Sequence, residues 1–338
     1  MLIDIFNHRA FNAVEVTNVM NVTPVRPEFL GNFGDRLFRT VRSRFRMIAV
    51  VKRENGMALI PVSPIGAPPV ELEGGKADAR PFFTRRLAKG STVYAEELQG
   101  VLQLPDFQQL QNVQAEIAAR AVTIREDIET THEHMRLGAI FGKVVDADGV
   151  RVLDDWFANW GVQPPVPVNF ALTVATTNLR GICQDVTNLM YEAAPTAWVQ
   201  NVTQVHSLVG KDFFRLLTTH PMVERTYLGY AAAAELRGGI ADDFEFGGIS
   251  WHRYRGTPGG EFNVADNEAR FFPVGARDAF QRALGPAEFE PFINTPGLDV
   301  YGLTIPDRDR GAWTRTEGYS YPLYMCLRPE MLQIGVAS

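Results

Sequence analysis

The stretch DFQQLQNVQAEIAARAVTIREDIETTHEHMRLGAIFGK, residues 106–143, contains no proline, and its only glycines are Gly138 and Gly142. Pro105 precedes it and Asp106 can cap its first turn, so the sequence predicts one helix over 106–143. At about 1.5 Å per residue the helix would be on the order of 50 Å long, which exceeds the usual length in globular domains. Apolar residues at three-, four- and seven-residue steps predict its buried face: Leu110, Val113, Ile117, Ala121, Ile124, Ile128 and Met135.

The same stretch carries two pairs of opposite charge four residues apart, Glu116 with Arg120 and Arg125 with Glu129. Residues at this spacing are neighbours on a helix surface, so both pairs are predicted to form ion pairs on the wetter faces. One long core helix or a short coiled-coil segment would account for the pattern. A spine laid across an extended subunit would account for it as well.

The amount and balance of charge restrict the class of protein. The chain has 338 residues, enough for two domains or one large one, and 46% of them are hydrophobic. With 21% charged residues and a net charge of −6, the chain can bury a core and is not disordered. No strongly basic stretch is present, which argues against specific nucleic-acid readout but leaves weak contact through local arginine clusters open.

Compartment signals are few. The two cysteines, Cys183 and Cys326, lie far apart and outside any CxxC or zinc-type spacing, so no disulfide framework is indicated and a reducing cytosol fits. The N-terminal MLIDIFNHRAF lacks the basic and apolar regions of a signal peptide. No run of about 18 apolar residues could span a membrane, so no membrane partner is expected.

Two segments before the helix are expected to need a partner surface. Residues 1–44 read as an extended arm with a short amphipathic helix near 11–20, and Pro24 and Pro27 force extended backbone after it. Residues 45–100 read as a long charged flap, with an Asn-Gly hairpin turn at 54–56 and a second turn at Gly74-Gly75. A two-stranded flap has too little core to be stable alone in water.

The part after the helix predicts an α+β module. Val144, Val145, Val150 and Val152 flank a turn at 146–149, which predicts a hairpin. The proline-rich stretch 161–170 is a plausible domain boundary. Further elements follow from periodicity and breakers: helices at 178–194 and 211–220, strands within 199–208, 247–257 and 269–276, and closing strands within 317–336.

A search for catalytic or metal-binding chemistry identifies no site. His132-Glu133-His134 does not match the i, i+4 histidine spacing of a helical zinc site, and packed or solvated imidazoles are favoured. No GxSxG elbow, phosphate-binding loop or GxGxxG after a strand occurs. The acid pairs Asp154-Asp155 and Asp242-Asp243 are expected to be solvated. The predicted catalytic, cofactor-binding and metal-ligating residues are therefore none, and the chain is predicted not to be an enzyme.

Two charge clusters have other interpretations. The densest basic cluster is Arg36, Arg39, Arg42, Arg44 and Arg46. These side chains could face nucleic acid, but an acidic neighbouring surface is favoured because the whole chain is acidic. The alternating run 307–310, Asp-Arg-Asp-Arg, predicts a salt-bridged loop and not a phosphate site.

The order of these parts resembles the phage major capsid protein E family, the lambda-type branch of the Hong Kong 97 fold. The most specific match is IPVSPIGAPPVELEGGKADARPFFTRRLAKGSTVYAEELQG, which is similar to the family's extended E-loop. DIETTHEHMRLGAIFGKVVDADG is a second strong match, and the N-terminal IDIFNHRAF and PVRPEFLGNFGDRLF resemble the family's arm. YSYPLYMCLRPEMLQIGV resembles its closing strands. The resemblance covers essentially the whole chain and is least distinctive over about 195–300.

The resemblance implies an α+β, Hong Kong 97-like capsid fold with five parts. These are an N-terminal arm over 1–44, an E-loop over 45–100, a P-domain over 101–165 with the spine helix at 106–143, an A-domain over 166–308, and C-terminal strands over 309–338 that close the core. It implies the major capsid protein of a tailed double-stranded DNA bacteriophage. Such a subunit assembles in the host cytoplasm into hexamers and pentamers of an icosahedral virion capsid, or head.

The same resemblance implies partners and no cofactor. A separate scaffold protein, a portal and a decoration protein are expected, together with nonspecific contact with packaged double-stranded DNA. Glu71 and Glu73 are hypothesised to pair with arginines of a neighbouring subunit. Gly138 and Gly74-Gly75 are candidate hinges for shell expansion. Some branches of the fold crosslink a lysine to an asparagine of a neighbour, and Lys76 lies near the flap turn, but the lambda-type branch is generally held by noncovalent contacts and decoration proteins.

Two other interpretations stay open on sequence grounds. An encapsulin-like nanocompartment shell protein would have the same fold and hold cargo enzyme instead of a genome. The arm and E-loop pattern favours the phage branch. A soluble hydrolase with an undetected site is the other alternative, and the lack of any catalytic spacing argues against it.

Overall fold

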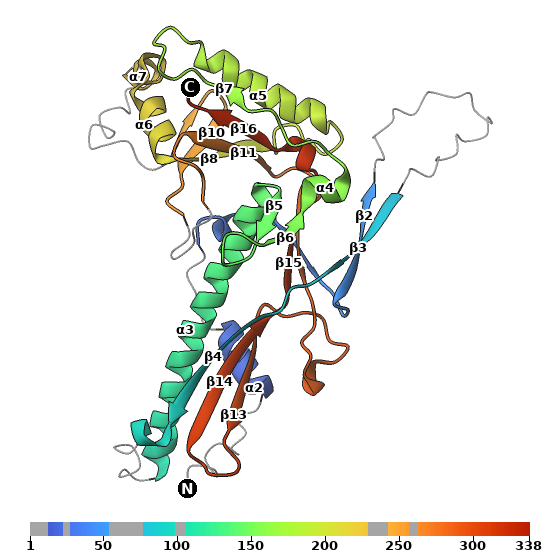
Figure 1. Cartoon of the computed structure of the whole chain (residues 1–338), viewed down its shortest axis with the longest axis vertical. Coiled ribbons are helices and arrows are strands. Elements are labelled where there is room, and N and C mark those ends of the chain that lie inside the picture. The colour runs from blue at the N-terminus through green and yellow to red at the C-terminus, as the bar shows by residue number, and fades with distance from the viewer. Residues whose placement is uncertain (1–12, 23–27, 54–76, 99–105, 229–242, 257–262) are drawn as a thin grey trace, which may run out of the picture. The chain divides into compact units, whose positions relative to one another are not determined.

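The computed structural model describes residues 13–22, 28–53, 77–98, 106–228, 243–256 and 263–338 (Figure 1). The chain divides into two compact units that are not contiguous in sequence. Unit 1 comprises 1–48, 83–137 and 282–325, and unit 2 comprises 49–82, 138–281 and 326–338. The five-part division made from the sequence stays a prediction.

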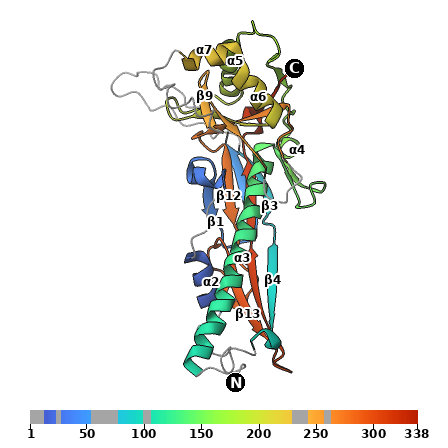
Figure 2. The same cartoon turned by 90° about the vertical axis from the view of Figure 1, so that its left-hand side faces the viewer.

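Unit 1 is built on the long helix α3, Asp106–Ile140, whose last three residues belong to unit 2. Beside α3 runs a three-stranded antiparallel sheet in the order β13 (Tyr301–Pro306), β14 (Trp313–Ser320) and β4 (Leu87–Tyr94). Figures 1 and 2 show these strands alongside the helix.

Glycines in this sheet allow the helices to approach it closely. A Cβ at Gly318 would lie 2.4 Å from a methyl carbon of Ile124 on α3, so only glycine fits there. Helix α2, Ala13–Val22, packs on β13 in the same way, because a Cβ at Gly302 would meet Val16 and Met20. Met20 joins the core that Ile124 and its helical neighbours form, and so the arm helix covers unit 1 from a distant part of the sequence.

Shorter elements complete unit 1. The turn η2 (Gly31–Arg36) leads into β1 (Arg39–Arg42), which forms a second sheet in the order β1, β12 (Phe280–Leu284) and β15 (Pro322–Cys326). Strands β2 (Met47–Arg53) and β3 (Ala77–Phe83) form a two-stranded sheet of their own, of which residues 49–53 and 77–82 belong to unit 2. The short 3-10 helices η3 (Ala95–Leu98) and η7 (Glu290–Phe292) lie in connections.

Unit 2 contains a six-stranded mixed sheet. Its order is β7 (Val168–Asn169), β16 (Gln333–Val336), β11 (Glu268–Val274), β8 (Gln204–Val209), β10 (Ile249–Arg253) and β9 (Asp243–Phe246). Helices α5 (Leu179–Ala193) and α6 (Lys211–Thr219) lie on one face of this sheet, and α7 (Pro221–Leu228) follows α6 (Figure 2). The hairpin β5 (Lys143–Val145) and β6 (Val152–Asp155), helix α4 (Trp156–Trp160) and turn η8 (Pro329–Met331) also belong to this unit.

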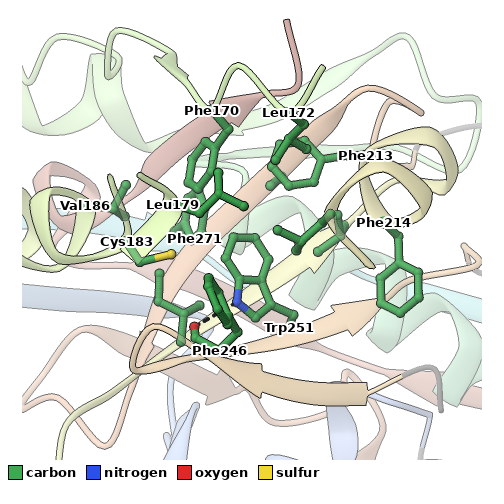
Figure 3. Packing of buried hydrophobic residues seen from close by; sticks show 14 of the residues in the cluster. Phe170, Leu172, Leu179, Cys183, Val186, Phe213, Phe214, Phe246, Trp251 and Phe271 are labelled. Atoms are coloured by element: carbon green, nitrogen blue, oxygen red, sulfur yellow. Dashed lines mark hydrogen bonds between the residues drawn. The ribbon is translucent and has the colours of Figure 1, made fainter. Parts of the chain in front are cut away.

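Aromatic side chains dominate the core of unit 2 (Figure 3). Trp251 is fully buried between Phe170, Phe213 and Phe271, with ring centroids 5.4 to 6.0 Å apart. Its indole Nε1 donates to the Phe246 carbonyl at 3.1 Å, so no polar atom of the ring is left without a partner. The packed rings and the acceptor of the indole N–H all come from one unit, as expected of a module that folds separately.

Most local predictions are confirmed. The long helix ends at Ile140 instead of Lys143, because Gly142 takes a left-handed conformation (φ 75°) and Lys143 begins β5. Five residues of its predicted apolar face are buried: Ile117, Ala121, Ile124, Ile128 and Met135. The side chains of Leu110 and Val113 lie outside the described residues.

The hairpin at 143–155 and the helices at 178–194 and 211–220 are present, as β5–β6, α5 and α6. Asn178 caps α5 by accepting from the Gly181 N–H, and Pro221, predicted to stop α6, begins α7. The turns predicted at 54–56 and 74–75 lie outside the described residues.

Candidate assembly surfaces

Arg120 fastens the long helix to the sheet of unit 1. Its guanidinium donates to Glu116 at 3.0 Å, to the Ser91 hydroxyl at 3.0 Å, to the Thr92 carbonyl at 2.7 Å and to Glu97 at 2.6 Å. The predicted pair of Glu116 with Arg120 is therefore present. Each of the three guanidinium nitrogens therefore donates to an acceptor of the same chain, which is the arrangement that stabilises an arginine at low exposure.

The second predicted pair, Arg125 with Glu129, is wrong. Glu129 is buried and accepts from Arg136 at 2.8 Å instead, while no ion pair of Arg125 occurs among the described residues. The error has a physical cause: residues 125, 129, 132 and 136 recur at helical spacing on one face, and this face is turned toward the interior of unit 1, not toward water.

Glu133, one helical turn after Glu129, accepts hydrogen bonds from the N-terminal arm. Its Oε1 accepts from the Leu30 N–H at 2.6 Å, and its Oε2 accepts from the Gly31 N–H at 3.1 Å and from Arg136 at 3.2 Å. The side chain is 1% exposed, and this burial raises the pKa of Glu133 from its ordinary 4.5 to about 7 although Arg136 and both backbone donors lower it. A cavity of about 300 Å³ lies under the same turn, lined in part by Gly31, Gly34 and Arg136.

A second charged group joins three distant segments of unit 1. Asp299 accepts from Arg42 of β1 at 2.7 Å and from Arg282 of β12. Burial opposes the charged form of Asp299, but Arg282 and Arg42 outweigh it and lower the pKa of this carboxyl. The ring of Tyr324 lies under the guanidinium groups of Arg136 and Arg282, at 5.4 and 5.9 Å from its centroid, and so links both charged groups.

Two arginines of the cluster predicted at 36–46 lie near acidic residues of the same chain. Arg42 contacts Asp299, and Arg46 lies 4.0 Å from Glu288 and over the ring of Tyr321. Arg86 shares Glu288 at 3.0 Å. For Arg42 and Arg46, the acidic surface that the sequence analysis favoured is therefore supplied within unit 1.

The histidines of the HEH motif are packed side chains. His132 is fully buried, and His134 is also buried. Ser320 donates its hydroxyl proton to the Asp299 carbonyl, so His132 must donate from Nε2 to the Ser320 oxygen at 3.0 Å. Burial, with Arg282, Arg136 and Arg125 nearby, lowers the pKa of His132 well below 6.5, and the ring is neutral. No group of three or more metal-ligating side chains is found in the described parts of the chain.

The acid pairs have structural partners. Asp155 caps α4 by accepting from the Ala158 N–H at 3.0 Å and pairs with Lys143 at 3.0 Å, which lowers its pKa against the opposing effect of partial burial. Asp243 lies 2.8 Å from the Nδ1 of His252. Asp242 lies outside the described residues.

The loop at 307–310 differs from its predicted form. One carboxylate, Asp307, accepts from the backbone N–H groups of Asp309, Arg310 and Ala312 at 3.1 to 3.2 Å. Neither Arg308 nor Arg310 forms an ion pair with any described residue. The prediction of a salt-bridged loop is therefore wrong. The Asp307 carboxylate closes the backbone turn through hydrogen bonds to N–H groups, and these bonds stabilise its charge without a neighbouring cation.

Gly138 lies at the boundary between the two units. A Cβ there would come within 2.8 Å of the Val144 Cα and 3.0 Å of the Lys143 carbonyl oxygen, so the helix approaches β5 closely at this point. Its role as a hinge stays a prediction.

Glu71, Glu73, Gly74, Gly75 and Lys76 lie outside the described residues. Neither Cys183 nor Cys326 forms a disulfide, and both side chains are buried.

Unit 1 exposes apolar side chains at the base of the β2–β3 pair. Phe45, Met47 and Phe83 are 69%, 53% and 58% exposed, and the Thr84 N–H donates to the Arg46 carbonyl between them. The outward face of α2 adds three exposed valines, Val14, Val19 and Val22. Exposed apolar side chains at the start of a two-stranded flap form a candidate contact surface. None of the described helices is long and apolar enough to cross a membrane.

Comparison with known proteins agrees with this architecture. The model of the family described as phage major capsid protein E matches residues 12–337. The major capsid protein of Salmonella phage Felix O1 (isolate Felix O1-VT1) is 26% identical over 272 residues, which cover 71% of this chain and 73% of that protein.

Two solved structures share the fold. The putative capsid protein of a prophage of E. coli CFT073 aligns with a TM-score of 0.59 at 13% identity, over 97% of this chain and 99% of that one. The capsid of Ralstonia phage GP4 aligns with a TM-score of 0.51 at 12% identity, over 90% and 88%. At these identities the likeness shows the fold alone.

The mixed helices and strands form the Hong Kong 97-like capsid fold. The chain belongs to the phage major capsid protein E family, whose members form the capsid of the virion. The sequence analysis identified this family correctly. It missed the buried charges of unit 1, for which the polar spacing 125, 129, 132 and 136 was the available signal.

Proposed function

We propose that this chain builds the icosahedral head of a tailed double-stranded DNA bacteriophage as hexamers and pentamers. The observation that carries the proposal is the apolar surface at Phe45, Met47 and Phe83, which one copy exposes and a neighbouring copy can cover. In this proposal residues 1–44 form the arm, 45–100 the E-loop, 101–165 the P-domain, 166–308 the A-domain and 309–338 the closing strands. The chain has no catalytic role.

This reading requires obligate contacts between copies of the chain. Such interfaces often bury more than about 2,000 Å² and have an apolar centre with a polar rim. Arg46 and Arg86, which both approach Glu288, are close in sequence to the exposed apolar residues and could supply such a rim. A scaffold, a portal, a decoration protein and the packaged DNA are proposed as partners on the strength of the family resemblance.

Co-expression of the full chain with a scaffold gene, followed by sedimentation and negative-stain electron microscopy, tests the proposal. Uniform icosahedral particles or capsomer rings are expected. A chain that stays monomeric with and without scaffold would contradict it. The contents of purified particles then separate a phage head from an encapsulin-like compartment, since the first packages nucleic acid and the second encloses protein cargo.

A further inference from the structure

Unit 2 contains a cavity of about 470 Å³, formed by the end of α5, the loop before β8 and the loop after β11. Its lining includes Tyr191, Trp198, Gln200 and Arg277. We propose that this cavity, the aromatic pocket, binds the proline segment 163–167 of a second copy of this chain. The inference rests on the proposed function, because copies of the chain must meet.

Contacts of unit 2 itself hold the walls of the aromatic pocket in place. The Arg277 N–H donates to the Ala197 carbonyl at 2.8 Å, which ties the loop after β11 to the loop after α5. Ala197 is 2% exposed. The rings of Tyr191 and Trp198 are perpendicular, at 89° with centroids 6.0 Å apart. The two rings therefore form an apolar corner that exists before any ligand arrives.

The aromatic pocket carries hydrogen-bond donors that the described part of the chain does not use. The Trp198 Nε1 and the Arg277 guanidinium donate to no described residue, and the same is true of the Tyr191 hydroxyl and the Gln200 amide. Indole and guanidinium groups are donors only. A ligand that matches this pocket must therefore bring acceptors together with apolar surface.

The proline segment, Gln-Pro-Pro-Val-Pro at 163–167, has this composition. Three of its five residues are prolines, which have no N–H, so only Gln163 and Val166 carry a backbone donor. No described residue donates to the carbonyls of 163–166. Val166 is 83% exposed. The segment thus presents unused acceptors and an apolar side chain to the outside.

The backbone of the proline segment is restricted to an extended form. Proline fixes φ near about −65°, and a residue that precedes proline is restricted to the β and polyproline II regions. Pro164 and Pro167 have the PxxP spacing, and polyproline II segments of this type dock into grooves lined by aromatic side chains. Little conformational entropy is lost on binding, because the segment is already ordered.

The occupant is a second copy because this chain carries both surfaces, and the segment does not line the pocket of its own chain. Pocket and segment are different surfaces of unit 2, so a contact between copies is head-to-tail. Head-to-tail contacts close into rings when the rotation from copy to copy allows it. The hexamers and pentamers of the proposed function are such rings.

The first test measures binding of the labelled synthetic peptide GVQPPVPV, residues 161–168, to the unassembled full-length chain by fluorescence anisotropy. Saturable binding to wild type is expected. Arg277→Gln should weaken it about tenfold, because a hydrogen bond from a charged donor is lost. Arg308→Gln is the matched control: Arg308 is also exposed and forms no ion pair with a described residue, and its loss should leave binding unchanged. A peptide with alanine in place of its prolines should not bind.

The second test locates the contact in assembled particles. Val166→Cys and Gln200→Cys are combined in one chain, whose two natural cysteines are buried. The particles are oxidised and then separated on a denaturing gel without reductant. A ladder of covalent multimers up to the hexamer is expected for a head-to-tail contact. Each single-cysteine variant should give no such ladder.

Three results would overturn the inference. Absence of peptide binding to wild type, or equal binding to R277Q, would exclude the aromatic pocket as the site. An oxidised double-cysteine chain that is linked only within itself would show that the segment fills its own pocket. Particles without a ladder would show that segment and pocket do not meet between copies. Failure of the wild-type chain to form particles would overturn the proposed function, whereas the peptide measurement reports on the pocket without assembly.

Discussion

The two units of this protein differ in the kind of residue that they bury. Unit 2 packs Phe170, Phe213, Trp251 and Phe271 on one sheet, and no charged residue belongs to that cluster. Unit 1 instead buries Glu129, Glu133 and Arg136 along its long helix. Apolar packing is tolerant of direction and of pH, whereas charged hydrogen bonds fix direction and respond to pH. Unit 2 therefore resembles a self-contained module, and unit 1 holds distant segments, the arm included, in one defined arrangement.

The largest expected effect comes from emptying the core of unit 2. Trp251→Ala should reduce the free energy of unfolding by about 3–5 kcal/mol, because it removes buried contact area and leaves a cavity among rigid rings. Urea unfolding of the unassembled chain followed by circular dichroism measures it. Leu189→Ala, at a position 43% exposed on α5, is the matched control and should change stability by less than about 1 kcal/mol. Comparable losses for both would refute the self-contained core.

Next in size is the pH dependence that Glu133 gives to unit 1. Its pKa is about 7 in the folded chain against an ordinary 4.5, so the folded state binds this proton more tightly. The stability that this proton contributes is fully present below pH 4.5 and is lost as the pH rises through 7, on the order of 3 kcal/mol in total. Unfolding curves at several pH values between 4 and 8 measure the slope.

Glu133→Gln provides the control for that slope. Gln cannot titrate, so the decline between pH 4.5 and 7 should flatten in this variant. Asp299 and Asp155, whose pKa values are lowered, act in the opposite sense and in more acidic solution, where their stabilisation is lost as the pH falls. A slope that is the same in wild type and E133Q would show that Glu133 is not its source.

A smaller effect tests the close approach of helix and sheet in unit 1. Gly318→Ala puts a methyl group 2.4 Å from Ile124 and should cost about 1–3 kcal/mol, because the tightly packed helix must shift. Gly161→Ala is an informative contrast: its site is open, so only the left-handed backbone (φ 66°) opposes the change. If thermal unfolding showed G318A to be as stable as wild type, the contact would be looser than the structure indicates.

The smallest expected effect comes from the fastening of the helix by Arg120. Arg120→Gln should cost about 1–2 kcal/mol, since the side chain is partly exposed and water can replace some of its hydrogen bonds. Raising the salt concentration should weaken wild type more than the variant. Identical salt dependence in the two proteins would show that the ion pairs with Glu116 and Glu97 contribute nothing measurable.

Sequence patterns predicted the elements whose causes are local. The spine helix, the hairpin at β5–β6 and helices α5 and α6 follow from periodicity, turn residues and caps within a few positions. Local patterns could not predict which segments form each unit, because each unit combines segments that are far apart in the chain. The family resemblance supplied the overall architecture that local patterns could not.

The buried charges show the same limit at the level of single residues. Glu129 has two arginines within helical reach, and the sequence alone favours Arg125 four residues away over Arg136 seven residues away. The outcome depends on which helix face is buried and on Asp299 and Arg282, which join from distant strands and loops. Long-range partners of this kind leave no periodic signal.

A reconstruction of particles assembled from the wild-type chain tests the account most directly. A closed icosahedral shell is predicted, in which neighbouring copies cover the exposed side chains of Phe45, Met47 and Phe83. Particles in which these apolar side chains face solvent would contradict the assignment of the contact surface. A chain that forms no shell under any condition with scaffold would contradict the account as a whole.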